Sequence, residues 1–187
     1  MLTNIEIKSQ NLKELYKNKI APNLKEHFKY KNVHQVPKLI KIQINRGLGS
    51  DGQNTKILQK SVNEIALISG QAPIITQAKK SIAGFKVREK MNLGVTVTLR
   101  NYKMYNFFGK IIHLVLPRIR DFRGLSLKGF DNEGNYNFGL QEQLVFPEIN
   151  YEDIDKIRGL NISVVTTAKT REEGIALLKE FGFPLID

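Results

Sequence analysis

The sequence predicts an α+β fold in which helices pack on one face of an antiparallel sheet and a long basic loop joins two of its strands. Residues 38–45, 94–100 and 160–166 alternate apolar and polar side chains, as half-buried strands do. Residues 55–69 and 101–115 instead carry apolar side chains at spacings of three and four, which indicates amphipathic helices. We expect one domain over residues 1–187, because this length and a 41% apolar content suffice for one core.

The chain begins with a helix and a strand. We expect residues 1–11 to be a flexible extension and residues 11–28 to be helical, with Pro22 kinking or dividing the helix. Its polar side fits either a solvated surface or contact with an RNA backbone, and carries Lys13, Lys17, Lys19, Lys25 and Lys29. The strand 38–45 places one set of side chains on an apolar face, Ile40, Ile42 and Ile44. Its other face is polar and presents Lys41, Gln43 and Asn45.

A glycine-rich segment at residues 47–52 follows this strand and formally matches the dinucleotide-binding pattern G-x-G-x-x-G. That fold places an acidic residue at the end of the next strand to bind the ribose, but Thr76 and Gln77 stand there. The nearby acid, Glu64, lies inside the predicted helix 55–69. We therefore interpret the glycines as a turn from strand to helix. The helix should end at Gly70, which is suited to a C-cap.

The next two predicted strands, 74–78 and 94–100, are joined by an exposed basic loop. The loop carries about four net positive charges, because one acid, Glu89, stands against Lys79, Lys80, Lys86, Arg88 and Lys90. Ser81 and Gly84 favour an adaptable backbone, and Phe85 offers apolar contact. Such a loop fits either an arm that reaches phosphates or a solvated hairpin.

After Arg100, Asn101 is a candidate N-cap for a helix with a continuous apolar stripe. We assign this stripe to the core; it comprises Met104, Phe107, Phe108, Ile111, Ile112 and Val115. A basic turn follows at residues 117–126, and its arginines could fork onto phosphates: Arg118, Arg120 and Arg123. A structural use, in which Asp121 pairs with one of them, is the alternative.

The last third of the chain is predicted to be sheet and helix with an acidic surface. Short extended pieces are expected at 136–138 and 143–146, an acidic segment at 148–155 and a strand at 160–166. Thr170 and Glu173 form a capping box for a final helix that runs to Phe181. The negative charge makes RNA contact improbable there and favours protein contact.

Charge is distributed unevenly along the chain, whose formal net charge is +11. Residues 1–128 hold 24 basic and 7 acidic residues, whereas residues 129–187 hold 5 basic and 11 acidic ones. Nucleic acid is the most economical partner for the basic part, and an anionic membrane is the weaker alternative, because no segment has the large aromatic face of an interfacial helix. The chain has no cysteine, no apolar run long enough to span a membrane and no recognisable targeting segment, so we expect it to work in a reducing compartment where it is made.

The sequence offers little catalytic chemistry. Three scattered histidines do not suggest a metal site, no nucleophile or phosphate-loop motif is present, and we expect neither a metal nor a cofactor. A binding module is therefore favoured over an enzyme. The polar strand faces carry no aromatic residue for base stacking; they present Lys41, Gln43, Asn45, Thr96, Thr98 and Arg100. This composition suits folded RNA that is recognised through 2′-hydroxyls, phosphates and shape.

Three stretches, residues 67–86, 117–126 and 166–169, resemble one family: large-subunit ribosomal protein number five, the 5S rRNA-binding family of bacterial and plastid type. The resemblance covers almost the whole chain. It implies a non-catalytic scaffold in the central protuberance, with 5S rRNA bound by Asn45, Gln71, Thr98 and Arg100, to which the polar face adds Lys41, Gln43 and Thr96. It also implies that the 79–92 loop contacts peptidyl-site tRNA through Lys79, Lys80, Ser81, Gly84, Phe85, Lys86 and Arg88.

Further partners implied by the resemblance are large-subunit rRNA, neighbouring ribosomal proteins and a small-subunit head protein, for which the acidic last third is the candidate surface. The chain departs from the family pattern after Arg88, since Lys90 and Asn92 stand where the family commonly has glycine and proline. Lysine outnumbers arginine by 21 to 8, which indicates an A+T-rich genome. We prefer the plastid stroma to a bacterial cytoplasm as the location. A non-ribosomal RNA-binding protein of the same fold is the alternative.

Overall fold

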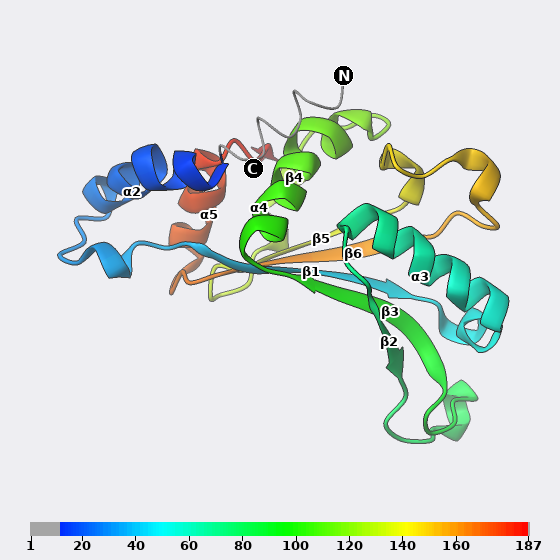
Figure 1. The fold of residues 1–187 in the computed structure, drawn as a ribbon. Helices are drawn as coiled ribbons and strands as arrows, with labels where there is room; N and C mark the ends of the chain where they lie inside the picture. The colour runs from blue at the N-terminus through cyan, green and yellow to red at the C-terminus, as the bar shows by residue number, and fades with distance from the viewer. Residues whose placement is uncertain (1–11, 187) are drawn as a thin grey trace. The chain divides into compact units, whose positions relative to one another are not determined.

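The computed structural model of the chain describes residues 12–186, so the extension expected at residues 1–11 lies outside the described part. It confirms the α+β class. Five strands form the main sheet in the order β2-β3-β1-β6-β5, and β2 and β3 pair antiparallel (Figure 1). These strands are β1 (Leu39–Gly47), β2 (Ile74–Gln77), β3 (Asn92–Leu99), β5 (Tyr136–Leu140) and β6 (Leu160–Thr166). The α-helices are α2 (Ala21–His27), α3 (Thr55–Ser69), α4 (Asn101–Lys110) and α5 (Arg171–Glu180).

Contacts divide the described residues into two compact units. Unit 1 comprises residues 12–42, 100–138 and 163–186, and unit 2 comprises residues 43–99 and 139–162. The chain passes from one unit to the other within β1, β5 and β6, so each of these strands contributes residues to both. Within unit 1, α2, α4 and α5 lie on the same side of its strand segments, and within unit 2, α3 covers one face of the strands (Figure 1).

The core of unit 1 is built around aromatic rings. Phe108 of α4 stacks on Phe183 with ring centroids 5.6 Å apart and meets Phe181 edge to face at 5.4 Å. Tyr136 of β5 meets Phe183 edge to face at 5.6 Å. All six residues of the apolar stripe predicted between Met104 and Val115 are buried, which confirms that this stripe is core. The helix continues past α4 as a π-helical segment, Ile111–Val115.

The core of unit 2 lies between α3 and the strands. The side chain of Asn54 caps α3 by accepting a hydrogen bond from the Lys56 amide at 3.0 Å. As predicted, the helix ends at Gly70, which adopts φ 64° in the left-handed region. An unforeseen feature is Arg46, which is fully buried (0% exposed) and bonds through Nη1 to Glu64 Oε2 at 2.5 Å. Burial lowers the pKa of the Arg46 guanidinium.

Several local predictions are wrong. Asn101 does not cap α4: Arg100 occupies the N-cap position, no side chain caps the helix, and Asn101 is its first residue with φ 51°. In β1 Ile40 is 43% exposed and Leu39 is buried, so the regular alternation begins only at Ile42. The extended run expected at 143–146 is instead a 3-10 helix, Gln143–Val145, whose buried Gln143 side chain donates to the Lys156 carbonyl at 2.9 Å.

The glycine-rich segment forms a turn, as we interpreted it. β1 ends at Gly47 and a 3-10 helix, Gly49–Gln53, leads into α3. Gly52 is required because a Cβ there would lie 2.4 Å from the Asn92 carbonyl oxygen, closer than real Cβ contacts come. The turn therefore packs against the start of β3, which accounts for Gly52 without a nucleotide.

The C-terminal elements agree with the sequence pattern. Thr170 Oγ1 accepts from the Glu173 amide at 3.4 Å, and Glu173 Oε2 accepts from the Lys169 amide at 2.8 Å, so both capping-box side chains are used. A second, two-stranded parallel sheet was not predicted; β4 (Leu125–Ser126) pairs with β7 (Leu185–Ile186). No helix within residues 12–186 is long and apolar enough to cross a membrane. Nor do the described side chains include a group of three acids or histidines that could hold a metal ion.

Candidate nucleic-acid interface

One polar face in unit 2 is formed by the neighbouring strands β1 and β3. Thr96, Thr98 and Gln43 are half-buried and Asn45 is exposed. The residues between them point to the other side, where Ile44, Val95, Val97 and Leu99 are buried beneath α3. Strand alternation thus brings the polar side chains to the face that the helix leaves uncovered, as predicted.

Hydrogen bonds hold this face in place. Gln43 Nε2 donates to Thr96 Oγ1 at 3.4 Å, and Thr96 Oγ1 in turn donates to the Ile44 carbonyl at 3.0 Å. The Thr96 hydroxyl proton is therefore donated within the sheet, and its oxygen, which already accepts from Gln43, keeps one further lone pair for a donor. Such a fixed acceptor is suited to a 2′-hydroxyl donor.

Gln71 joins the same unit from the turn after α3. Its Nε2 donates to the Thr98 carbonyl at 3.2 Å, and its own amide donates to Ser69 Oγ at 3.3 Å. The first bond ties the Gln71 side chain to the end of β3, and the second ties the Gln71 backbone to the end of α3. Five predicted residues are thus placed together in unit 2: Gln43, Asn45, Gln71, Thr96 and Thr98.

The other two predicted residues, Lys41 and Arg100, belong to unit 1. Lys41 is half-buried in β1, two residues before Gln43, and Arg100 is exposed directly after β3. Arg100 stands at the N-terminus of α4, where no side chain caps the backbone amides. Uncapped amides and a guanidinium at one helix end favour an anion.

Strand pairing adds two residues that sequence patterns did not identify. Thr76 lies opposite Gly94 and Ile74 lies opposite Thr96 in the β2–β3 register, and directly opposed residues share a face of an antiparallel sheet. Thr76 is half-buried and Ile74 is 70% exposed. Both therefore lie on this face, where Thr76 adds a hydroxyl and Ile74 adds an exposed apolar side chain. The register that reveals this cannot be inferred from a four-residue strand taken alone.

Residues 78–91 join β2 to β3 and are held by hydrogen bonds of their own. The Ala78 amide donates to the Met91 carbonyl at 2.9 Å, and Ile82 and Val87 bond to each other through both amides at 2.9 and 3.2 Å. Ser81 Oγ accepts from the Glu89 amide at 2.9 Å, so this serine orders the connection instead of loosening it.

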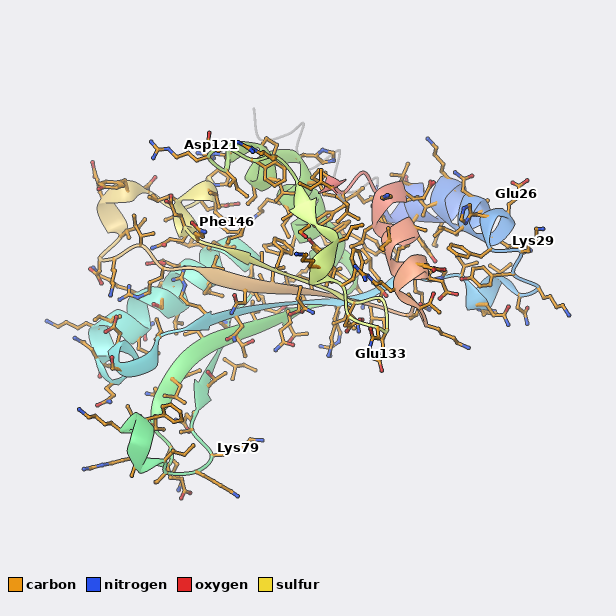
Figure 2. The ribbon with its side chains drawn as sticks, turned by 180° about the vertical axis from the view of Figure 1, so that it is seen from behind. Glu26, Lys29, Lys79, Asp121, Glu133 and Phe146 are labelled. Carbon is orange, nitrogen blue, oxygen red and sulfur yellow. The ribbon has the colours of Figure 1, made fainter. Side chains whose placement is uncertain are left out.

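The side chains of this connection face solvent. Six of the predicted loop residues are exposed along with Phe85, which is 77% exposed: Lys79, Lys80, Ser81, Gly84, Lys86 and Arg88. Figure 2 shows Lys79 near the far end of the β2–β3 hairpin, beyond its two strands. Ordered backbone and exposed cations together make a surface able to meet phosphates.

Comparison with known proteins shows which family the chain belongs to. Residues 32–88 match the family described as ribosomal protein L5, and residues 92–185 match the model of that ribosomal family's C-terminus. The chain belongs to the ribosomal protein L5 family. It is 62% identical over 175 residues to the large ribosomal subunit protein uL5c of Gracilaria tenuistipitata var. liui, covering 94% of this chain and 98% of the relative.

Other L5 relatives agree. The uL5c of Heterosigma akashiwo (strain NIES-293 / 8280G21-1) is 62% identical over 176 residues, and the uL5 of Trichodesmium erythraeum (strain IMS101) is 60% identical over 176 residues. Each match covers 94% of this chain and 97% of the relative. As an L5 protein, the chain is a structural, non-enzymatic constituent of the large ribosomal subunit and is located on the ribosome. Family membership thus favours a ribosomal protein over the alternative of a non-ribosomal protein of the same fold.

The departure from the family pattern has a conformational counterpart. Lys90, one of the two residues at which the sequence departs from the pattern expected from the resemblance, adopts φ 63° in the left-handed region. Glycine takes this conformation without steric cost, whereas a lysine there is strained by about 1 kcal/mol or more. The return of the hairpin toward β3 therefore carries local backbone strain at Lys90.

Proposed function

We propose that this L5 protein binds 5S rRNA in the central protuberance of the large subunit, without catalysis. The contacts are assigned to Lys41, Gln43, Asn45, Gln71, Thr96, Thr98 and Arg100. The observation that carries this assignment is the Gln43–Thr96–Ile44 chain of hydrogen bonds, which fixes polar groups on an uncovered, non-aromatic sheet face. Fixed hydrogen-bonding groups suit the 2′-hydroxyls and phosphates of folded RNA.

The proposal is tested by titrating the purified chain with 5S rRNA over a range of salt, with tRNA as competitor. Specific contacts predict that 5S affinity survives excess tRNA and that much of it persists as salt rises, because hydrogen bonds are less screened than phosphate contacts. A steep and equal loss of affinity for both RNAs as salt rises would show only nonspecific attraction between the basic protein and RNA. That result would contradict the assignment.

Arg100→Ala is expected to weaken 5S rRNA binding by about 1.5–3 kcal/mol, or roughly 10- to 150-fold in Kd, because a charge-assisted contact is lost. The same titration measures it. Lys103→Ala, which changes another basic residue in the first turn of α4, is the matched control and should alter binding less. Unchanged affinity in folded Arg100→Ala would remove Arg100 from the interface.

We also propose that the hairpin residues 79–92 contact peptidyl-site tRNA on the assembled ribosome. The exposed Lys79, Lys80 and Lys86 supply charge there, while the polar face lies on the strands. Changing all three to glutamine is expected to leave 5S affinity within about twofold and to weaken tRNA retention in the peptidyl site, because each phosphate contact is worth about one unit of salt slope. Loss of 5S binding in this triple variant would contradict the division between the two surfaces.

Two further assignments rest on surface chemistry and on relatives. The acidic segment 148–155 exposes Glu148, Glu152 and, at 77%, Tyr151, which suits contact with a basic protein such as one of the small-subunit head. We propose a plastid ribosome as the setting, since the relatives named uL5c match at 60–62% identity; the 60% match to a uL5 keeps the bacterial cytoplasm as the alternative.

A further inference from the structure

A second cationic surface lies in unit 1, on the segment between α4 and β5. From residue 117 to residue 128 the chain holds four basic residues against one acid, Asp121. All four cations are on the surface: Arg118, Arg120, Arg123 and Lys128. We call this segment the arginine turn. It belongs to neither of the surfaces assigned above.

The backbone of the arginine turn is fixed at both ends. The Ile119 amide donates to the Leu116 carbonyl at 3.2 Å, which continues the helical turn, and the Leu125 amide donates to the Pro184 carbonyl at 2.8 Å. Gly124, at φ 125°, packs so closely on β7 that a Cβ would lie 2.9 Å from Ile186 Cγ2. The turn is thus anchored at both ends.

Side chains of unit 1 also hold the backbone at Ser126 and Leu127. Tyr136 Oη donates to the Ser126 carbonyl at 2.9 Å, and Arg171 Nη2 donates to the Leu127 carbonyl at 2.9 Å. Burial raises the pKa of the Tyr136 phenol to about 12, so this donor keeps its proton at neutral pH. Lys128 is therefore also presented on a rigid backbone.

The geometry does not favour the structural alternative, in which Asp121 pairs with one of the arginines. Asp121 is exposed and sits at φ 51°, at the edge of unit 1 where Figure 2 labels it. Among residues 12–186 it forms no ion pair with Arg118, Arg120 or Arg123. The three guanidinium groups are available to a ligand.

We propose that the arginine turn binds the phosphate backbone of an RNA segment other than the one held by the polar face of β1 and β3. Guanidinium groups match phosphate oxygens two at a time, and a turn that is ordered beforehand loses little conformational entropy on binding. RNA backbone is the polyanion that surrounds a large-subunit protein, which favours it over an acidic protein. This inference does not require that 5S rRNA be the ligand of the polar face.

The test compares binding of the full chain to two probes, 5S rRNA and a transcript of large-subunit rRNA, over a range of salt. Changing Arg118, Arg120 and Arg123 to glutamine is expected to weaken binding to the large-subunit transcript tenfold or more and to reduce its salt slope by about three. Binding to 5S rRNA should change less than about twofold. The Arg-to-Lys triple variant should keep the slope but recover only part of the affinity.

Two controls make the result decisive. Changing Lys31, Lys169 and Lys179 to glutamine removes the same charge from other exposed positions of unit 1. The single variant Arg120→Gln tests the turn with one exposed side chain changed. Arg120→Gln should lower the slope by about one. An equal loss in the lysine control, an equal loss for both RNAs, or wild-type binding in the glutamine triple variant would each overturn the proposal.

Discussion

Replacement of Arg46 by methionine is expected to lower the free energy of unfolding by about 3–5 kcal/mol. The Arg46 side chain is fully buried and its Nη1 bonds to Glu64 Oε2 at 2.5 Å, while Glu64 itself is buried on α3. Removing the guanidinium leaves a buried carboxylate without its charge partner. Urea unfolding of the free chain, followed by circular dichroism, measures the change.

The pair variant Arg46→Met/Glu64→Leu separates the loss of a contact from the presence of an unpaired charge. We expect it to recover most of the stability, because two apolar side chains replace two desolvated ions. Within the described residues, Arg46 Nε and Nη2 are buried and lack a hydrogen-bond partner, so the original pair is itself incompletely satisfied. Equal destabilisation of the single and pair variants would mean that packing, not charge, sets the cost.

Gly94→Ala is expected to destabilise unit 2 by about 1–3 kcal/mol and to weaken RNA binding together with it. A Cβ at Gly94 would lie 2.4 Å from the Arg46 carbonyl oxygen and 3.2 Å from Thr76 Oγ1. The first of these is backbone of β1, so β1 and β3 must shift to make room. That shift moves the strands that carry Asn45 and Thr96.

Gly139→Ala is the matched control for this change. Gly139 is also a strand glycine of unit 2, but a Cβ there meets Asn161 Oδ1 at 3.5 Å, an ordinary contact. Alanine should be neutral or should stabilise by up to about 1 kcal/mol, because glycine loses more chain entropy in a strand. Urea unfolding measures the stability of both variants, and the 5S titration measures their RNA affinity. Equal effects of Gly94→Ala and Gly139→Ala would refute the steric explanation.

Long periodic patterns predicted the fold well. β6 alternates over its whole length and β3 from Val95 onward, and the stripe from Met104 to Val115 repeats at helical spacing, because one side of each element is buried. Gly70 and the Thr170–Glu173 box were also predictable, since helix ends have local chemistry. On the polar face, Gln43, Asn45, Thr96 and Thr98 followed from alternation, whereas Gln71 came from the family resemblance.

Features that depend on tertiary contacts could not be predicted. In the sequence Arg46 resembles any surface cation, and only the structure shows that α3 places Glu64 against it. Asn101 is a good cap by composition, but the helix begins one residue earlier than that role requires, and Asn101 adopts φ 51°. The β4–β7 pair has two residues per strand, too few for any period. The position of Ile74 on the same face as Thr96 could be recognised only from the register of β2 against β3.

The composition of the two units has a consequence for the order in which the nascent chain can fold. All of unit 2 lies within residues 43–162, so its contacts can form once that stretch has left the exit tunnel. Unit 1 draws on residues 12–42 and on residues 163–186, and β7 must emerge before β4 has a partner. The helices within residues 12–27 therefore lack part of their core until residues 163–186 have been made. The arginine turn, which β7 anchors, would likewise gain this anchor only after residues 185–186 have emerged.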